Sequence, residues 1–281
     1  MYVCDSCATC LYDKQAYKIK DEKYLEKVKE IIDNRGEKDS APFLIYQFNR
    51  VYKKMYGSSN EYAEIKQRYN DLVLGFEDKI RKVIENDDFP LARAFQYSRV
   101  GNYIDFGAMN SVDEEIFMNL LSEAKMSEAD RRTFDSFIKQ CANAKTFLLL
   151  CDNCGEIVLD KLFLEQLKKK FPDLSVTVMV RGKEVLNDAT IWDAQYVGMD
   201  RVANIIDNGY DMAGTVYEML PEKSKEIFDS ADIIMSKGQG NYESLYRDGR
   251  HIFYSFLCKC DLFMKRFDVP EFTGIFVEEG A

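Results

Sequence analysis

The chain has 281 residues, of which 46% are hydrophobic and 31% are charged, a composition typical of a globular protein with a sizeable core. The formal net charge of −10 is unfavourable for binding nucleic acid or an anionic membrane surface, because such binding depends on clustered Lys and Arg. No hydrophobic run is long enough to span a bilayer, and the first residues lack the basic and apolar segments of a signal peptide, so we expect a cytoplasmic protein.

The first half of the chain is predicted to be helical, because apolar and aromatic residues recur there at helical spacing. Ser40 can cap one helix that continues to Tyr56, and Ser111 and Ser127 can begin two others. We therefore expect a helical domain over residues 1–144. The helices are expected over residues 14–32, 40–56, 61–84 and 90–101, from 111, and from 127 to about 144.

From residue 145 onwards, apolar runs alternate with helical segments at intervals of about thirty residues, a rhythm that indicates βαβ units and a mainly parallel sheet. An α/β domain with such a sheet is expected over residues 145–281. The predicted strands are residues 146–150, 176–180, 202–206, 233–235 and 252–257.

Polar residues follow two of these predicted strands. Asp152 and Asn153 come after residues 146–150, and Asp188 lies in the turn after residues 176–180. Two carboxylates and an amide carbonyl suit a hard divalent cation such as Mg²⁺ or Mn²⁺, which takes oxygen ligands. The alternative is that Asp152 and Asp188 only cap helices, a common use of Asp in strand-to-helix turns.

A third turn, after residues 233–235, is rich in glycine and contains Lys237, Gly238, Gly240 and Asn241. Backbone N–H groups and one lysine in such a turn can cradle a phosphate group. The spacing is not that of a Walker A loop, and no Gly-x-Gly-x-x-Gly follows the first strand, so dinucleotide binding is not indicated.

Cys4, Cys7 and Cys10 form a Cys-x2-Cys-x2-Cys run at the start of the chain. Three thiols at this spacing could bind zinc or part of an iron–sulfur cluster, with Cys258 or Cys260 as a distant fourth ligand. The alternative is that they are free thiols, as in most proteins of reducing compartments. The single histidine, His251, precedes an apolar run and is interpreted as a strand-edge residue, which excludes a His-rich zinc site.

Four segments together resemble the metal-dependent damage-control phosphatase family, long catalogued as domain of unknown function 89, and its branch with N-terminal cysteines. In chain order they are residues 101–107, 152–156, 181–190 and 237–243. The resemblance implies a helical domain packed on a Rossmann-like α/β domain with helices on both faces of its sheet.

The resemblance also implies roles for particular residues. It implies a metal ion held by Asp152, Asn153 and Asp188, and a catalytic role for Lys237 beside the two aspartates. Substrate contacts are implied for Lys237, Gly238, Gly240 and Asn241, with Asn102 and Asp105 closing the cleft. Glu156 and Asp193 are expected to position water outside the ligand set.

We therefore expect a metal-dependent phosphatase that hydrolyses small phosphorylated metabolites with water activated by Mg²⁺, Mn²⁺, Co²⁺ or Ni²⁺. Direct attack by Asp152 is the other possible route, but the Asp-x-Asp pair of the haloacid-dehalogenase class is missing. One alternative function is an S-adenosylmethionine-dependent carboxyl methyltransferase, although the usual glycine spacing after the first strand is absent. Another is a non-catalytic metabolite-binding module with a structural cation.

Overall fold

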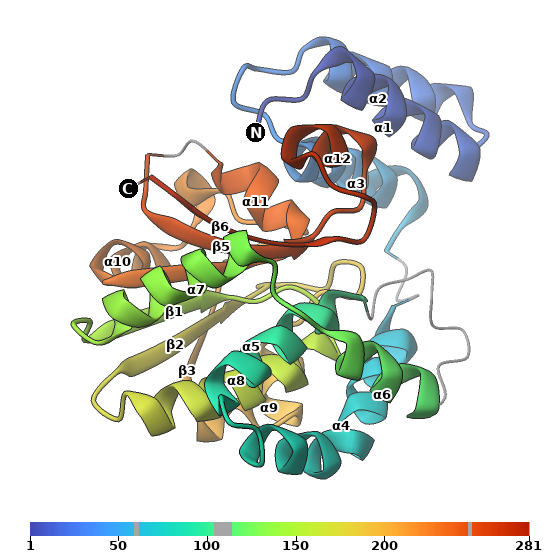
Figure 1. The fold of residues 1–281 in the computed structure, drawn as a ribbon. Helices are drawn as coiled ribbons and strands as arrows, with labels where there is room; N and C mark the ends of the chain where they lie inside the picture. Colours follow the sequence, from blue (N-terminus) through green and yellow to red (C-terminus); the bar gives the residue numbers. More distant parts are fainter. Residues whose placement is uncertain (59–61, 104–113, 247–248, 281) are drawn as a thin grey trace.

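The computed structural model describes residues 1–58, 62–103, 114–246 and 249–280 of the chain. Its strands are β1 (Thr146–Leu150), β2 (Ser175–Val180), β3 (Asn204–Asp207), β4 (Ile233–Lys237), β5 (Ile252–Leu257) and β6 (Gly274–Glu279). They form a sheet with the order β3-β2-β1-β4-β5-β6 (Figure 1). β1 to β5 run parallel, and β6 pairs with β5 in the antiparallel direction. The predicted α/β fold with a mainly parallel sheet is confirmed.

The helices surround this sheet. They are α1 (Asp5–Lys18), α2 (Glu22–Asp33), α3 (Ala41–Tyr56), α4 (Ala63–Glu85), α5 (Pro90–Val100), α6 (Glu114–Glu123), α7 (Glu128–Cys141), α8 (Glu156–Lys170), α9 (Ile191–Tyr196), α10 (Glu222–Ser230), α11 (Gln239–Leu245) and α12 (Asp261–Phe267). Three short 3₁₀ turns add to them: η1 (Gly101–Tyr103), η2 (Met199–Arg201) and η3 (Tyr217–Met219).

Both faces of the sheet are buried, because successive side chains of a strand point to opposite faces. In β1, Phe147 and Leu149 pack into one core with α4, α5, α7 and α8. Leu148 and Leu150 pack into a second core with side chains of α10, α11 and α12. The expected helices on both faces are therefore present, and the strands read as continuous apolar runs for this reason.

The first three helices form a third core of their own, which includes Val28 of α2 and Leu44 and Phe48 of α3. The single helix predicted over residues 14–32 is wrong, since the chain leaves the helix at Ile19 and α2 starts anew. Asp21 caps α2 by accepting hydrogen bonds from two backbone N–H groups. The other predicted helices are confirmed within a few residues, and the division at residue 144 stays a prediction.

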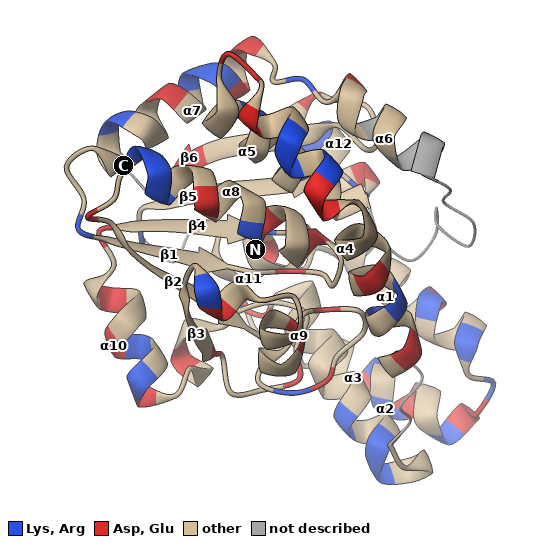
Figure 2. Cartoon of the chain, turned by 90° about the horizontal axis from the view of Figure 1, so that it is seen from below, with Lys and Arg blue, Asp and Glu red and all other residues tan. Residues whose placement is uncertain are grey.

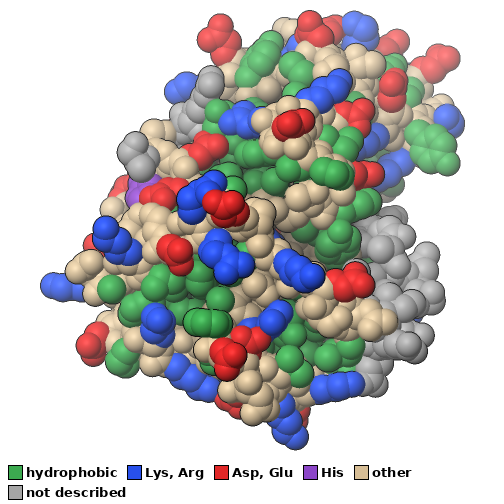
Figure 3. Space-filling view, in the orientation of Figure 1, with side chains coloured by type: hydrophobic (Ala, Val, Ile, Leu, Met, Phe, Trp, Pro, Cys, Tyr) green, Lys and Arg blue, Asp and Glu red, His purple; other side chains and the backbone are tan. Residues whose placement is uncertain are grey.

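β6 is the main element that the sequence did not predict. It covers the outer edge of β5 and runs against the other five strands, so it does not follow the βαβ rhythm. Lys and Arg alternate with Asp and Glu along outer helices such as α2, α7 and α10 (Figure 2), and both signs are mixed across the face in Figure 3. Within the described residues, no helix has the length and apolar character needed to cross a membrane.

Candidate active site

The register of the sheet brings three turns to one edge. Leu150 of β1 pairs with Met179 of β2 and with Ser236 of β4. The chain therefore leaves the sheet at the same level after each of these strands, which is the edge where open α/β folds place their ligands. Asp152, Arg181 and Gly238 all lie just beyond that level.

Backbone hydrogen bonds join the first two of these turns. Cys154 N donates to Asn187 O at 2.8 Å, and Ala189 N donates to Asp152 O at 2.8 Å. Asn153 and Asp188 consequently form an isolated antiparallel bridge. The two aspartates and Asn153, predicted from sequence as one ligand set, therefore lie side by side in the structure.

Arg181 connects the two aspartates. Its Nε donates to Asp188 Oδ2 at 2.6 Å, and its Nη2 lies 3.4 Å from Asp152 Oδ1. Asn241 holds the guanidinium from the other side, since its Oδ1 accepts from Arg181 Nη1 at 2.9 Å. Sequence reasoning gave Arg181 no role, although an arginine directly after a buried strand was a usable signal.

Asn102, from η1, reaches the same carboxylate. Its Nδ2 donates to Asp152 Oδ2 at 3.0 Å and to Glu156 Oε2 at 2.9 Å. Asn153 Nδ2 contacts the same two oxygens, at 2.9 Å and 3.2 Å. Two amide groups thus fix the orientation of Asp152, and Lys259 Nζ secures Asn102 by donating to its backbone oxygen at 2.9 Å.

Lys237 lies behind this group rather than at its surface. Its side chain is fully buried, and its ammonium group contacts Glu156 Oε1 at 2.6 Å and Asp160 Oδ1 at 2.7 Å. Ser98 accepts two further contacts through its backbone oxygen and its hydroxyl. Three N–H donors already face four protein acceptors. The structure therefore does not support the predicted contact between Lys237 and a substrate phosphate.

The glycine loop after β4 packs against the site with little free surface. A Cβ carbon at Gly238 would meet the Asp152 carboxylate, and one at Gly240 would meet Ala213 O. The Gly238 N–H donates to Ser255 O. Asn241 is fully buried and bonds Arg181 and Thr215 through its oxygen. Gly238 and Asn241 therefore position Asp152 and Arg181, and the substrate contacts of Gly238, Gly240 and Asn241 stay predictions.

Charge is unevenly balanced in this buried group. Burial raises the pKa of Asp152 well above its ordinary value, and the charges of Asp188 and Glu156 raise it further, while Arg181 and Lys259 lower it. Three cations (Arg181, Lys237 and Lys259) face four carboxylates (Asp152, Glu156, Asp160 and Asp188). A divalent cation would relieve this excess of negative charge, and the oxygen donors fit Mg²⁺ or Mn²⁺.

The candidate ligand set has only two carboxylates. In the described part of the chain, no three His, Cys, Asp or Glu side chains form a group that could hold a metal ion. Asn153 would therefore have to act as the third protein ligand through its amide oxygen, as predicted. A site with one or two carboxylates that keeps several waters is typical for Mg²⁺.

Glu156 and Asp193 are the two residues expected to position water. Glu156 contacts the site directly through Asn102, whereas Asp193 is connected to it through Asn70. Asp193 pairs with Lys66 at 2.7 Å and accepts a hydrogen bond from Asn70 Nδ2 at 3.2 Å. Asn70 Oδ1 in turn accepts from Gly155 N at 2.7 Å. Asp193 thus supports the turn that carries Asp152. Asp105 lies outside the described residues.

The other predicted sites lie elsewhere. Cys4 and Cys7 are close, with their sulfur atoms 3.4 Å apart, while Cys10 is exposed. His251 stands directly before β5, and its Nε2 lies 2.7 Å from Glu278 Oε1 of β6. This position agrees with a strand-edge histidine.

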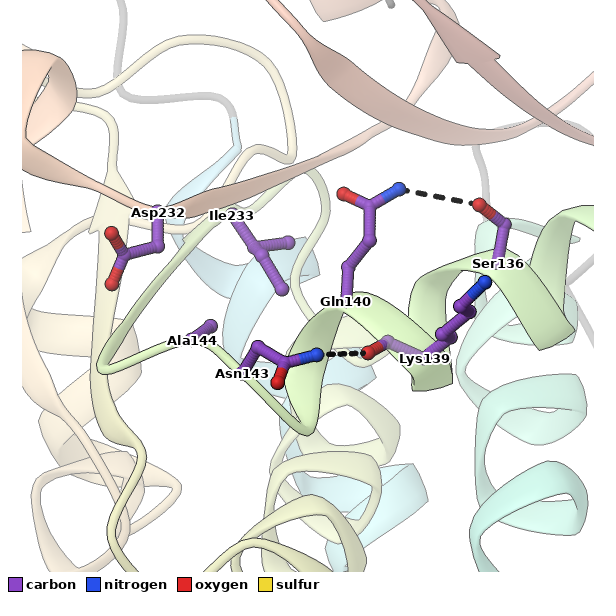
Figure 4. A pocket seen from close by; sticks show the side chains of 7 residues that line it. All are labelled: Ser136, Lys139, Gln140, Asn143, Ala144, Asp232 and Ile233. Carbon is purple, nitrogen blue, oxygen red and sulfur yellow. Dashed lines mark hydrogen bonds between the residues drawn. The ribbon is translucent and has the colours of Figure 1, made fainter.

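Two of the hollows in the surface of the described residues are large enough to hold a small ligand. One of about 860 Å³ lies between α1, α2 and α3 and the loop that leads to Asp188, and Lys183, Val185 and Leu186 of that loop line it. The other, about 450 Å³, lies at the opposite edge of the sheet beside Asp232 and Ile233 (Figure 4). Asp232 there accepts hydrogen bonds from Lys145 N and Thr146 N, a structural role. The first hollow shares residues 183–186 with the loop that leads to Asp188, although Asp152, Asn153 and Asp188 do not line it.

Known proteins resemble this chain over nearly its whole length. An uncharacterized protein of Methanocaldococcus jannaschii is 34% identical over 239 residues, which cover 82% of this chain and 77% of the relative. A damage-control phosphatase of Archaeoglobus fulgidus is 30% identical over 277 residues, 93% of each chain.

A solved structure shows the same fold. The crystal structure of a DUF89 family protein from Pyrococcus horikoshii matches with a TM-score of 0.81 at 21% identity, covering 99% of both chains. The family model of the damage-control phosphatase ARMT1-like domain matches residues 4–273. With this match, the chain belongs to the damage-control phosphatase ARMT1-like family.

Proposed function

We propose that this protein is a metal-dependent phosphatase that hydrolyses small phosphorylated metabolites. The observation that carries the proposal is the junction of two strand ends, which brings Asp152, Asn153 and Asp188 together in a buried group with excess negative charge. The relatives named damage-control phosphatase support the same activity.

The residues that would hold a divalent cation are Asp152, Asp188 and Asn153, through their side-chain oxygens. When bound, such a cation polarises a phosphoryl oxygen and lowers the pKa of a bound water molecule. Asp152 is the member of this set with the most exposed side chain, at 13%, against 3% for Asp188. Substrate would therefore approach from the Asp152 side.

The surrounding residues hold this arrangement in place. Arg181 fixes one oxygen of each aspartate, and Asn102 fixes the other oxygen of Asp152. Glu156 Oε2 accepts a hydrogen bond from Asn153 Nδ2 at 3.2 Å, so the amide nitrogen of Asn153 faces Glu156 and its amide oxygen would be the metal ligand. Preorganisation of this kind avoids rearrangement during the reaction.

We assign the non-phosphate part of the substrate to the hollow of about 860 Å³ beside this site. Leu186, two residues before Asp188, lines it, so a ligand in the hollow lies next to the loop that carries the aspartate. Tyr24 and Tyr52 offer aromatic surface there. Both signs of charge line it, positive from Lys18 and Lys183 and negative from Glu184 and Asp211. These groups suit a small polar metabolite.

The proposal is tested by measuring phosphate release from a panel of phosphorylated metabolites after exhaustive chelation and after adding back Mg²⁺, Mn²⁺, Co²⁺ or Ni²⁺. We expect no release after chelation and recovery with at least one metal. Full activity in the chelated protein would contradict metal dependence. Methyl transfer from S-adenosylmethionine without phosphate release would favour the methyltransferase alternative.

The assignment of the hollow has its own test. Tyr52→Ala should raise KM for the best substrate and leave kcat nearly unchanged, because Tyr52 lines the hollow and packs on the core of α1, α2 and α3, away from the core that carries the aspartates. Tyr217→Ala, on η3 and outside the hollow, is the control and should leave KM unchanged. Equal KM values for the Tyr52 variant and the unmodified protein would place the substrate elsewhere.

A further inference from the structure

Cys4 and Cys7 form a close pair at the start of α1. Their sulfur atoms lie 3.4 Å apart, and both side chains are only partly buried. Cys4 is the N-cap residue of α1, and Cys7 lies three residues later, so the first turn of the helix brings the two side chains to the same face. The pair needs little movement to form a bond between the sulfur atoms.

The segment before the pair is held in place. Val3 is buried, and its backbone oxygen accepts a hydrogen bond from Arg35 Nε at 3.0 Å. Arg35 also pairs with Asp5 at 2.6 Å. The position of Cys4 relative to α1 is therefore fixed by contacts with the end of α2.

The two thiols have unequal reactivity. The Ser6 hydroxyl, 3.1 Å from Cys4 Sγ, and then the Cys7 backbone N–H lower the pKa of Cys4. Burial and then the neighbouring Cys4 sulfur raise the pKa of Cys7 to about 12. An N-terminal cysteine of lowered pKa followed by a protected partner is the arrangement found in thiol–disulfide exchange sites.

We propose that Cys4 and Cys7 are a redox-active dithiol that forms an intramolecular disulfide by exchange with a low-molecular-weight disulfide such as oxidised glutathione. The Cys4 thiolate attacks one sulfur of that disulfide, forms a mixed disulfide and releases one thiol. Cys7 then loses its proton, attacks Cys4 Sγ and releases the second thiol. The dithiol is oxidised by two electrons, and the small disulfide is reduced to two thiols.

The geometry favours a dithiol over the metal site considered from the sequence. Cys10 is exposed, and Cys7 and Cys10 make no group of three ligands with Cys4 in the described residues. Cys260 is near enough to Cys7 to influence its pKa, but its sulfur contacts Gln239 Nε2 at 3.7 Å. Two sulfur atoms are sufficient for a disulfide, whereas a structural zinc ion takes four ligands.

The test equilibrates the full-length protein in glutathione buffers of stepped redox ratio, blocks free thiols by alkylation and maps the peptides by mass spectrometry. We expect Cys4 and Cys7 to become protected together, with the loss of two hydrogens, while Cys10 stays alkylated at every ratio. In Cys7→Ser, Cys4 should instead carry one glutathione. Cys10→Ser is the matched control and should oxidise like the unmodified protein.

Three outcomes would overturn the proposal. One is alkylation of Cys4 and Cys7 at all redox ratios. Another is a disulfide that joins Cys7 to Cys260 or Cys10 instead of Cys4. The third is stoichiometric zinc or iron in the purified protein that is released when Cys4 and Cys7 are modified, because the pair would then be metal ligands. None of these outcomes depends on phosphatase activity.

Discussion

Gly238 lies directly against Asp152. A Cβ carbon at position 238 would stand 2.0 Å from Asp152 Oδ2 and 2.2 Å from Asp152 Cγ. Both distances are far below van der Waals contact, so no side chain fits at this position. The backbone of Gly238 also has φ +82° and ψ 150°, a conformation used almost only by glycine. The loop after β4 therefore sets the position of the Asp152 carboxylate, which lies two residues beyond the end of β1.

The first prediction concerns Gly238→Ala. The methyl group must displace the Asp152 carboxylate, and a shift of about 1 Å at a reacting group can lower turnover by roughly a hundredfold. Gly57→Ala is a matched control, because Gly57 has φ 88° and ψ 177° but no atom within 4 Å of its Cβ position. Both variants should lose about 1–3 kcal/mol of stability. Phosphate release should fall only in the first, and equal activities would contradict this.

The second prediction separates function from stability at Asp152. Asp152→Asn should abolish metal-dependent phosphate release and leave Tm unchanged or raised, because burial and the charges of Asp188 and Glu156 disfavour the ionised carboxylate. Asp232→Asn is the matched control. It makes the same chemical change at a carboxylate whose pKa is lowered by hydrogen bonds from backbone N–H groups. This control should lower Tm slightly, because the exposed carboxylate is screened by solvent, and keep full activity. A lower Tm for Asp152→Asn than for Asp232→Asn would contradict the conclusion that the ionised Asp152 carboxylate destabilises the folded protein.

The third prediction is that Lys237→Met destabilises the protein by about 3–5 kcal/mol, since it leaves Glu156 and Asp160 buried without their cation. Burial alone would lower the pKa of Lys237, but Asp160 and Glu156 outweigh it and the net shift is upward. Denaturant unfolding measures the loss. A variant with unchanged stability and lost turnover would instead support direct contact between Lys237 and the phosphate.

The fourth prediction concerns pH. Burial raises the pKa of Asp160 to about 6 from an ordinary 3.8, Lys237 opposes the shift and Glu156 adds to it. Between about pH 4 and pH 6 the unfolded chain therefore loses this proton before the folded protein does, so the contribution of Asp160 to the free energy of unfolding falls as pH rises. The difference in stability between the unmodified protein and Asp160→Asn should fall over this window and stay constant above it. If this difference in stability instead rises with pH, the pKa of Asp160 is lowered in the folded protein, which would contradict the prediction.

The part of the fold that follows the hydrophobic pattern could be predicted from the sequence. β1 and β5 were placed with their observed bounds, because buried parallel strands are continuous apolar runs. The break before α2 was missed, since Asp21 is an ordinary polar residue until its cap contacts are known. β6 was missed because its apolar run is only three residues long, residues 275–277, and its antiparallel pairing with β5 cannot be read from the βαβ pattern.

The candidate site was predictable only where the topology determines it. Parallel strands end at one edge, so the proximity of Asp152 and Asp188 follows from the sheet. The burial of Lys237 does not follow from the sheet. Its partners Ser98 and Asp160 come from α5 and α8, which are distant from Lys237 in the sequence. A lysine in a glycine-rich turn has the same sequence signature whether it faces solvent or two buried carboxylates.

The independent core of α1, α2 and α3 affects how this family can diversify. These helices supply Tyr24 and Tyr52 to the hollow, whereas β1 and β2 carry the aspartates on a different hydrophobic core. On the proposed assignment of the hollow to the substrate, substitutions in residues 1–56 should change which metabolite is accepted and leave the aspartates in place. Exchanging these three helices between relatives would then transfer substrate preference without altering the proposed metal site.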